Sequence, residues 1–336
     1  MRVLVIGGSG AFSSRLSALA AQAGHEVLVV SRGQRPLALE PGLRHLQADR
    51  HRLRDHAATL SAFAPEVVVD AICFQSQQAQ DLVELFAAAR RVVLISSVDV
   101  YGEDVGALPV DEARTPSPAT GYARGKLACE RVVLEGLGPR ATVVRPSHML
   151  GRGFRPTSLW GRSPVMADRL RRGLPVPVVD GGRNLMTPVH ALDVARCVLA
   201  TFDEPRADGQ VLNAVGAEIV TQRHYFECAA ALLGGPPPQL LSVPAGLFRC
   251  HSEVGSALHW HRPYSHAKAA ERLGHKPAAT LGLMMEEMLL HEAEHGLLVA
   301  AETDPRFDRL CALLRRHQDE LDRWFADEAA ARSARA

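Results

Sequence analysis

The sequence predicts an α/β fold, with a doubly wound parallel sheet and a smaller mixed α/β domain. Through the first half of the chain, short runs of β-branched residues alternate with helical segments, which is typical of βαβ units with helices on both faces of the sheet. After about residue 150 this alternation stops, and glycine, proline and arginine crowd the chain. Ligands of a parallel sheet bind beyond the carboxyl ends of its strands, so the residues that follow each strand are the first candidates for function.

The elements are expected in a regular order. The chain opens on a buried strand at residues 2–6, and a helix with apolar periodicity follows over 11–23 and ends at Gly24. Later helices are expected at 76–90 and 122–137. The strands that alternate with the helices read "HEVLVVS", "LRHLQAD", "EVVVDAI", "RVVLISS" and "ATVVRPS".

Two domains are expected, because the segment "TPVHALDVARCVLATF" returns the chain to the sheet after the change near residue 150. The larger domain is predicted to comprise residues 1–150 with about 186–213, and the smaller one residues 151–185 with about 214–300. An amphipathic helix and tail are expected over 305–336.

Composition indicates an ordinary globular protein. Of the 336 residues 47% are hydrophobic, and the net charge of +1 gives no reason to expect a nucleic acid or an anionic membrane as partner. The chain reaches a core strand by its second residue, so we expect no signal peptide, and no apolar run is long enough to span a bilayer. The scattered cysteines, without a CxxC pair, indicate reduced thiols in the cytoplasm: Cys73, Cys129, Cys197, Cys228, Cys250 and Cys311.

The stretch "GGSGAFSS" after the first strand has the features of a phosphate-binding turn. Gly7 and Gly10 occupy the first two positions of G-x-x-G-x-x-G, and Ser13 occupies the third. The first glycine permits the tight turn, and the second lets the backbone approach a pyrophosphate at a helix N-terminus. The third position lets the helix pack close to the sheet, which a small serine also allows. The turn therefore predicts a dinucleotide site.

The end of the second strand favours NADP over NAD. A carboxylate there would bind the ribose hydroxyls of NAD, but this chain has Ser31 and Arg32, which suit a 2′-phosphate. Asp49, at the end of the third strand, is positioned to accept a hydrogen bond from the adenine amino group.

Two Tyr-x-x-x-Lys pairs occur, at Tyr122 and Lys126 and at Tyr264 and Lys268. On a helix this spacing places phenol and ammonium on one face, where the ammonium would lower the pKa of the phenol. Only the first pair follows a strand that ends in serines, the second of which is Ser97, so we assign the first pair to proton transfer and the second to structure.

Residues from Val3 to about Leu297 resemble the extended short-chain dehydrogenase/reductase family, the NAD-dependent epimerase/dehydratase group, as an outlying member. The resemblance implies a Rossmann-type NAD(P) domain, a substrate-binding smaller domain, a Ser97-Tyr122-Lys126 triad, and a homodimer formed through the helix of the Tyr-Lys pair. The segments that carry it are "GGSGAF", "HEVLVVSRG", "ISSVDVYG", "YARGKLACE", "VVRPSHMLGRG", "TPVHALDVA" and "AKAAERLG".

With this resemblance, candidate site residues can be assigned in two groups. The cofactor is expected to contact Gly7, Ser9, Gly10, Ala11, Phe12, Ser31, Arg32, Asp49, Arg50, Ala71, Ile72, Tyr122, Lys126, Pro146, Ser147 and His148. The substrate is expected to contact Cys73, Ser97, Asp99, His148 and Arg183.

Two departures from the family bear on the reaction. Asp99 stands where dehydratases and decarboxylases of the family often carry a glutamate base, so it is either a second catalytic carboxylate or a local capping residue. Where many relatives place an arginine that grips a substrate diphosphate, this chain has Met186, which cannot bind phosphate. Either Arg183 substitutes for that arginine or the substrate has no diphosphate.

The segment "HEAEH", His291 to His295, matches the zinc-protease pattern H-E-x-x-H. It lies in the closing helical segment, and no third ligand can be identified from the sequence, so no metal is expected.

Three functions remain open. The first is an NAD(P)-dependent oxidoreductase or epimerase that acts on a secondary alcohol or ketone of a sugar or sugar-nucleotide-like substrate. The second is an NADPH-dependent ketoreductase of a secondary metabolite without a nucleotide. The third is a cofactor-binding protein without catalysis, against which the intact triad argues.

Overall fold

The fold is taken from a computed structural model that describes residues 1–35, 41–103, 106–246 and 259–333. The chain divides into two compact units, each built from three segments. The first unit comprises Met1–Phe154, Met186–Ile219 and His261–Glu287. The second comprises Arg155–Leu185, Val220–Trp260 and Met288–Ala336.

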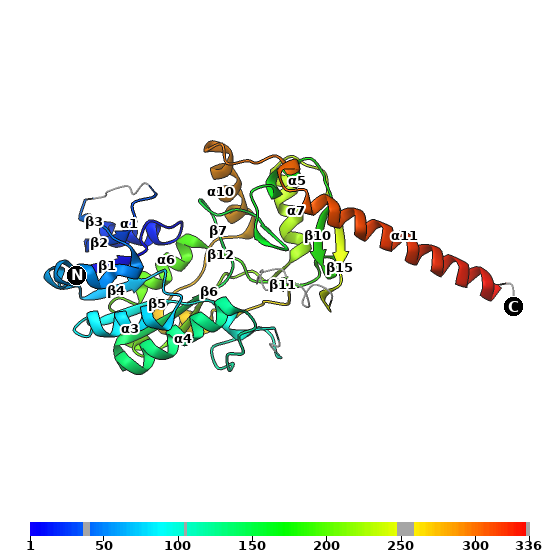
Figure 1. Cartoon of the computed structure of the whole chain (residues 1–336). Helices are drawn as coiled ribbons and strands as arrows, with labels where there is room; N and C mark the ends of the chain where they lie inside the picture. The colour runs from blue at the N-terminus through cyan, green and yellow to red at the C-terminus, as the bar shows by residue number, and fades with distance from the viewer. Residues whose placement is uncertain (36–40, 104–105, 247–258, 334–336) are drawn as a thin grey trace. The chain divides into compact units, whose positions relative to one another are not determined.

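A seven-stranded sheet forms the centre of the first unit, in the order β13-β6-β5-β4-β1-β2-β3 with every neighbouring pair parallel (Figure 1). The strand order reverses between β1 and β4, where a doubly wound sheet opens a crevice for ligands. The predicted α/β class and Rossmann-type sheet are therefore confirmed. The strands are β1 (Arg2–Ile6), β2 (Glu26–Ser31), β3 (Leu43–Gln47), β4 (Val67–Asp70), β5 (Arg91–Ile95), β6 (Ala141–Pro146) and β13 (Val211–Ala214).

Alternation along β1 explains why helices cover both faces of this sheet. Val3 and Val5 belong to one apolar cluster and Leu4 and Ile6 to another, since successive side chains of a strand point to opposite faces. The first cluster includes residues of α1 (Ser13–Gln22) and α6 (Ala191–Ala200). The second includes residues of α2 (Ala57–Phe63), α3 (Ser76–Leu85) and α4 (Gly121–Leu137).

A buried ion pair joins α4 to β6. Arg145 donates from Nε and Nη2 to the two carboxylate oxygens of Glu130, at 3.0 and 2.6 Å, and Ser96 donates to the same carboxylate. All three residues are at least 95% buried, so this arrangement is satisfied internally rather than by water. It fixes the end of β5, which leads directly into the predicted catalytic serine.

The segment 261–287, which the sequence places in the smaller domain, lies in the first unit. Its helix α9 (Ala267–Leu273) packs beside β13, and Lys268 donates to the carbonyl oxygen of Val211 at 2.9 Å. Tyr264 is buried and packs against Tyr101, with ring centroids 5.7 Å apart. The second Tyr-Lys pair therefore makes structural contacts with the core.

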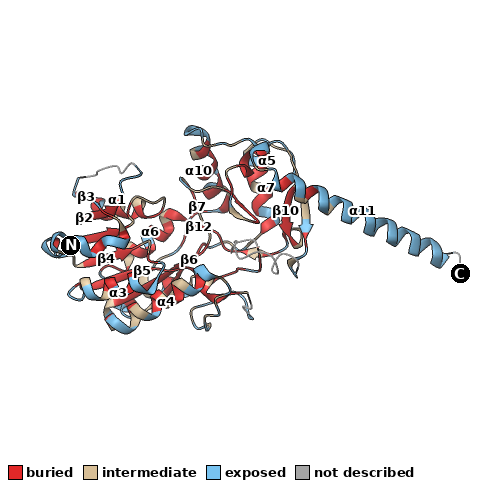
Figure 2. Cartoon of the chain, viewed as in Figure 1, coloured by how far each residue is buried: buried red, intermediate tan, exposed pale blue. Residues whose placement is uncertain are grey.

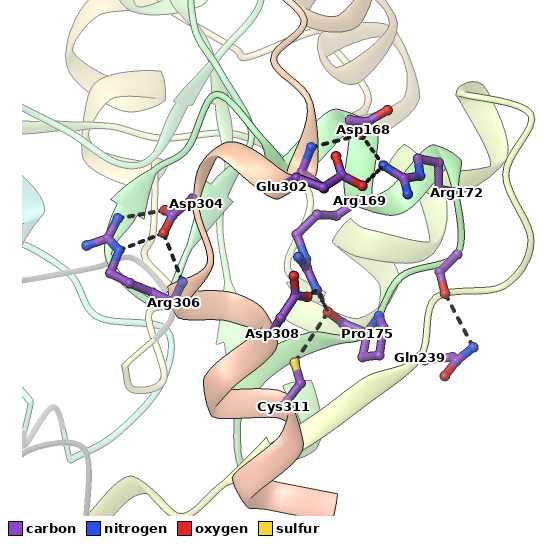
Figure 3. A network of polar contacts seen from close by, with 12 residues as sticks. Asp168, Arg169, Arg172, Pro175, Gln239, Glu302, Asp304, Arg306, Asp308 and Cys311 are labelled. Carbon is purple, nitrogen blue, oxygen red and sulfur yellow. Dashed lines mark hydrogen bonds and ion pairs between the residues drawn. The ribbon is translucent and has the colours of Figure 1, made fainter.

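In the second unit, β10 (Val176–Val179) pairs in parallel with β15 (Leu240–Val243). The fully buried Arg169 holds the last helix against this ribbon, because it donates to Asp308 and to the Pro175 carbonyl, both at 2.8 Å (Figure 3). The helices of the unit are α5 (Met166–Arg171), α7 (Gln222–Leu232) and α11 (Arg306–Ser333).

Shorter elements complete the description. The helix α10 (Leu281–Glu294) passes from the first unit into the second. The remaining strands have two residues each: β7 (Met149–Leu150), β8 (Thr157–Ser158), β9 (Gly161–Arg162), β11 (Leu185–Met186), β12 (Val189–His190) and β14 (Val220–Thr221).

The helix α11 is buried only near its start. Phe307 and Cys311 are buried against the second unit, whereas almost all later residues are exposed (Figure 2). Among the described helices, none is both long and apolar enough to cross a membrane. The described cysteines carry free thiols, and Cys250 lies outside the described residues.

We predict that Glu292→Gln removes a pH dependence of stability. Burial raises the pKa of the Glu292 carboxyl from 4.5 to about 7, against the opposing charge of Arg155. The folded state therefore holds the proton more tightly than the unfolded state, and this stability is lost as pH rises from about 4.5 through about 7. In urea titrations at pH 8, the free energy of unfolding of the variant should exceed that of the native protein by about 2–3 kcal/mol. At pH 4.5 the two free energies of unfolding should be nearly equal.

The matched control is Glu286→Gln, which changes an exposed carboxylate on the same helix and should leave the pH profile unchanged. Equal effects of the two substitutions at pH 8 would show that burial of Glu292 does not control its ionisation.

Candidate active site

The turn after β1 has the geometry that a phosphate site needs. Gly7 adopts φ +80°, and a Cβ there would lie 2.8 Å from Cγ2 of Ile72. A side chain is therefore excluded both by the backbone conformation and by the neighbouring strand end. The helix α1 begins at Ser13 directly after this turn, so its N-terminus faces the crevice between β1 and β4.

Ser13 does more than replace a helix-packing glycine. It is 98% buried, and its hydroxyl donates to the Gly7 carbonyl at 2.5 Å while it accepts from the Gly10 N–H at 3.1 Å. The serine therefore closes the turn with its own side chain. A glycine at this position could not make these two hydrogen bonds.

A cavity of about 420 Å³ opens beside this turn. That volume lies within the range typical of small-molecule sites. The predicted cofactor residues that line it are Gly7, Ser9, Gly10, Ser31, Arg32, Asp49, Arg50 and Ile72. The lining residues that sequence reasoning missed are Ile6, Val30, Gln34, Arg35, Ala48, His51, Phe74 and Gln78.

Two exposed guanidinium groups, Arg32 and Arg35, lie on the wall formed by the end of β2. Within the described part of the chain no ion pair of 4 Å or less involves either of them, and Ser31 lies beside them with its hydroxyl 2.9 Å from Nε2 of His45. Asp49 uses one carboxylate oxygen to cap the following turn, at 2.8 Å from the N–H of His51. This end of the cavity is therefore cationic, as a phosphate monoester requires.

Arg50 contributes to the cavity wall, but its charge is used internally. It is 96% buried, donates to Asp70 at 2.8 Å, and donates to the Gln78 carbonyl at 2.6 Å. The pair with Asp70 joins the segment after β3 to the end of β4. Arg50 therefore shapes the crevice rather than offering a free charge to it.

Ser97, Tyr122 and Lys126 are brought together beyond the end of β5. Ser97 caps the short turn that follows this strand and accepts from the N–H of Asp99. Lys126 is 98% buried, and its ammonium donates to the carbonyl oxygens of Cys73 and Ile95, at 2.9 and 2.8 Å. Tyr122 is half-exposed one helical turn earlier, and its ring centroid is 5.9 Å from Nζ of Lys126.

The sequence predicts that Lys126 lowers the pKa of Tyr122. This prediction is wrong, because the pKa of the phenol is raised in the structure. Removal from water raises the pKa of the Tyr122 phenol, and only the Ser97 hydroxyl acts in the opposite direction. Burial also lowers the pKa of Lys126, although Asp70 opposes the shift. The ammonium points toward two main-chain carbonyls rather than toward the phenol, which explains the difference.

Phe74 is the aromatic residue that sequence reasoning missed. The residue is 44% exposed, and its ring lies over the Lys126 ammonium, 4.2 Å from Nζ, with its centroid 6.1 Å from that of Tyr122. Gly125 allows this contact, since a Cβ there would lie 2.5 Å from the Phe74 carbonyl oxygen. The available signal was its place in the loop that follows β4, four residues after Asp70.

Asp99 does not present a free carboxylate. It is paired with the guanidinium of Arg262, a residue that is 94% buried. A carboxylate held by a buried cation is a poor base, because protonation would leave that cation without its partner. The geometry therefore supports a local structural role for Asp99.

The other predicted site residues lie at the cavity margin or elsewhere. Ala11 and Phe12 follow the phosphate turn, and Ala71 follows β4; none of these three lines the cavity described above. Cys73 is fully buried, and its carbonyl rather than its thiol contacts Lys126. Pro146 is the last residue of β6, and Ser147 and His148 follow it. Arg183 is exposed and belongs to the second unit.

We predict that Ser13→Ala loosens the phosphate turn. The substitution removes two hydrogen bonds and leaves the Gly10 N–H with a weaker main-chain contact, so the unfolding free energy should fall by about 1–2 kcal/mol. Urea denaturation followed by circular dichroism measures the change. Ser14→Ala, on the same helix, should change it by less than about 0.5 kcal/mol, and equal midpoints for the two variants would contradict the bridging role of Ser13.

Comparisons with known proteins agree with this geometry. The family model "NAD dependent epimerase/dehydratase family" matches residues 3–214. The chain is 27% identical to the 2'-dehydrokanamycin reductase of Streptomyces kanamyceticus, over 73% of this chain and 70% of that protein. It is 26% identical to the chloroplast stem-loop binding protein of 41 kDa b of Arabidopsis thaliana, over 71% of this chain and 65% of that protein. The chain thus spans slightly less than two thirds of the second relative.

Among solved structures, UDP-glucuronic acid 4-epimerase from Bacillus cereus in complex with NAD is similar, with a TM-score of 0.72 and 18% identity over 88% of this chain and 99% of that one. This similarity shows the fold. The family match confirms the resemblance to extended short-chain dehydrogenases/reductases and the expectation of a nicotinamide-dependent enzyme of the oxidoreductase/epimerase class. The chain therefore belongs to the NAD-dependent epimerase/dehydratase family.

Proposed function

We propose that this protein is an NADP-dependent oxidoreductase that reduces a ketone on a sugar-like substrate to a secondary alcohol. One observation carries the proposal: the half-exposed phenol of Tyr122 lies beside Ser97 and a buried lysine, in the same unit as a dinucleotide cavity with a cationic end. A phenol is protonated near neutral pH, so it is available as a proton donor.

The cavity fits the cofactor. The positive φ and crowding at Gly7 leave no room for a side chain where a pyrophosphate would meet the backbone, and α1 directs its N-terminus there. We assign the pyrophosphate to the turn from Gly7 to Gly10 and the adenosine 2′-phosphate to Arg32 and Arg35. Lys126 is assigned to the nicotinamide ribose. When bound, the nicotinamide supplies the hydride.

The chain's own residues would then complete the reduction. Ser97 donates a hydrogen bond to the ketone oxygen and holds it beside the phenol of Tyr122. As the carbonyl carbon gains hydride, its oxygen becomes basic and takes the phenol proton from Tyr122. The Ser97 hydroxyl, whose hydrogen bond lowers the pKa of the Tyr122 phenol, then stabilises the phenolate until solvent returns a proton.

The residues around Met186 favour a substrate without a nucleotide diphosphate. Met186 is 99% buried, and Arg262, which forms an isolated β-bridge with it, pairs with Asp99. A methionine therefore occupies the position where sugar-nucleotide enzymes carry a phosphate-binding arginine, and the guanidinium beside it is already used by Asp99. The name of the Streptomyces relative, 2'-dehydrokanamycin reductase, supports a reductase. The second unit, with Arg183, is the part of the chain that we assign to substrate recognition.

A second candidate is a binding protein without catalysis, which the name of the stem-loop binding relative favours. The net charge of +1 and the intact Ser-Tyr-Lys set argue against it. An epimerase, the third candidate, would keep its nicotinamide bound and consume none. Net oxidation of added NADPH with a panel of oxidised sugars distinguishes the reductase from both.

We predict that Arg32→Ala weakens the preference for NADPH over NADH. Loss of the guanidinium should weaken NADPH binding about tenfold or more and change NADH binding less than about twofold, because only NADPH carries the extra phosphate. Fluorescence titration of the purified protein measures both dissociation constants. Arg131→Ala, an exposed arginine on α4, is the control and should leave both unchanged. A native protein that prefers NADH would contradict the assignment of Arg32.

We predict that Tyr122→Phe lowers turnover by about 10²–10⁴-fold, measured with the ketone that the native protein reduces fastest. The dissociation constant for NADPH should stay the same, because the phenol transfers a proton but does not hold the cofactor phosphates. Turnover is measured from the rate of NADPH oxidation, and the dissociation constant by fluorescence titration. Tyr264→Phe removes the phenol of the buried second pair and should keep most of the activity. Full turnover by Tyr122→Phe would overturn the mechanism.

A further inference from the structure

We propose that His291, Glu294 and His295 form a surface site for a transition-metal ion at the C-terminal end of α10. From sequence the segment "HEAEH" has two histidines and no identifiable third ligand. The structure supplies one, because a nitrogen of each histidine and a carboxylate oxygen of Glu294 lie within 4.8 Å of one another. None of these three residues lines the dinucleotide cavity, and the site does not depend on the proposed reduction.

The spacing of the three side chains suits a first-row divalent cation. Residues three and four apart share one face of a helix, and the ring centroids of His291 and His295 are 4.1 Å apart. Ligands around a tetrahedral Zn²⁺ with bonds near 2.1 Å are about 3.4 Å apart, so small rotations of these side chains would complete the geometry. Glu294 and His295 are exposed and His291 is half-buried, so an ion can reach all three.

The orientation of His295 favours metal binding. Its Nδ1 lies 3.0 Å from the main-chain carbonyl oxygen of His291. When Nδ1 carries the hydrogen and donates to that carbonyl, the other ring nitrogen, Nε2, is left unprotonated and can bind a metal ion. A ligating histidine is usually held by such a hydrogen bond from its second ring nitrogen.

The end of the helix supplies a favourable field. The helix α10 ends at Glu294, and Gly296 follows with φ +62°, the conformation that commonly terminates a helix. The last carbonyl groups of a helix carry partial negative charge, which stabilises a cation within one turn. The carboxylate of Glu294 adds a full negative charge at the same place.

The site is not arranged for hydrolysis. In H-E-x-x-H proteases the glutamate after the first histidine acts as the base beside the metal. Here that residue, Glu292, is fully buried and is paired with Arg155 at 3.5 Å. The third ligand is Glu294, and Glu292 is not available as a base. The ion would therefore have three protein ligands and water in its open position. Imidazole nitrogens with one carboxylate select Zn²⁺, Ni²⁺ or Cu²⁺ over Mg²⁺ and Ca²⁺.

The test uses tag-free, metal-stripped full-length protein titrated with ZnCl₂ in a calorimeter at pH 7.5. The native protein should bind one Zn²⁺ per chain and should not bind Mg²⁺ at the same concentrations. His295→Ala and Glu294→Gln, both at exposed positions, should each weaken Zn²⁺ binding by a factor of about ten or more. His317→Ala removes an exposed histidine of α11 and should leave the affinity unchanged.

Affinity should also fall as pH drops toward 6, because protonated imidazoles do not bind metal. Failure to bind Zn²⁺, or binding that survives both His295→Ala and Glu294→Gln, would overturn the proposal. NADPH binding, measured in the same samples, should be the same in all variants, so the result does not depend on the fate of the proposed reductase function.

Discussion

The contact of the Lys126 ammonium with the carbonyls of Cys73 and Ile95 is the constraint on which the site depends. One side chain ties α4 to the ends of two neighbouring strands, and burial makes both hydrogen bonds costly to lose. Gly125 must lack a side chain for the helix to come this close. The same approach sets the position of Tyr122 relative to Ser97 and places Phe74 over the ammonium. The hydrogen bonds of the Lys126 ammonium therefore stabilise the fold and also position the side chains of the candidate active site.

The parts that the sequence predicts well are those with local signals. The strand runs, the Gly7 turn and the "YARGK" helix each have a local pattern that indicates their conformation, and the alternation of strands and helices indicates a parallel sheet. Contacts between distant segments have no such signal. The pairing of Asp99 with Arg262 spans the sequence from the sheet to the closing segment, so a free carboxylate was expected at Asp99 as one of two alternatives.

The same distinction explains the error in the Tyr122 pKa. Helical spacing puts phenol and ammonium on one face, but it does not show that other acceptors compete for the ammonium. Two main-chain carbonyls at strand ends do so here. Ser13 shows the opposite case, because the substitution that makes the turn look incomplete in sequence supplies its hydrogen bonds in the structure.

Segments of the two units alternate along the sequence, and this has a consequence for folding during translation. The first unit needs β13, α6 and α9, which come from Met186–Ile219 and His261–Glu287, far beyond the strands that they cover. Until those segments leave the ribosome, β6 is an open sheet edge and the cluster beneath α6 is exposed to water. One edge of β6 therefore stays unpaired while residues 147–210 are synthesised, and unpaired strand edges of this kind are where partly folded chains associate.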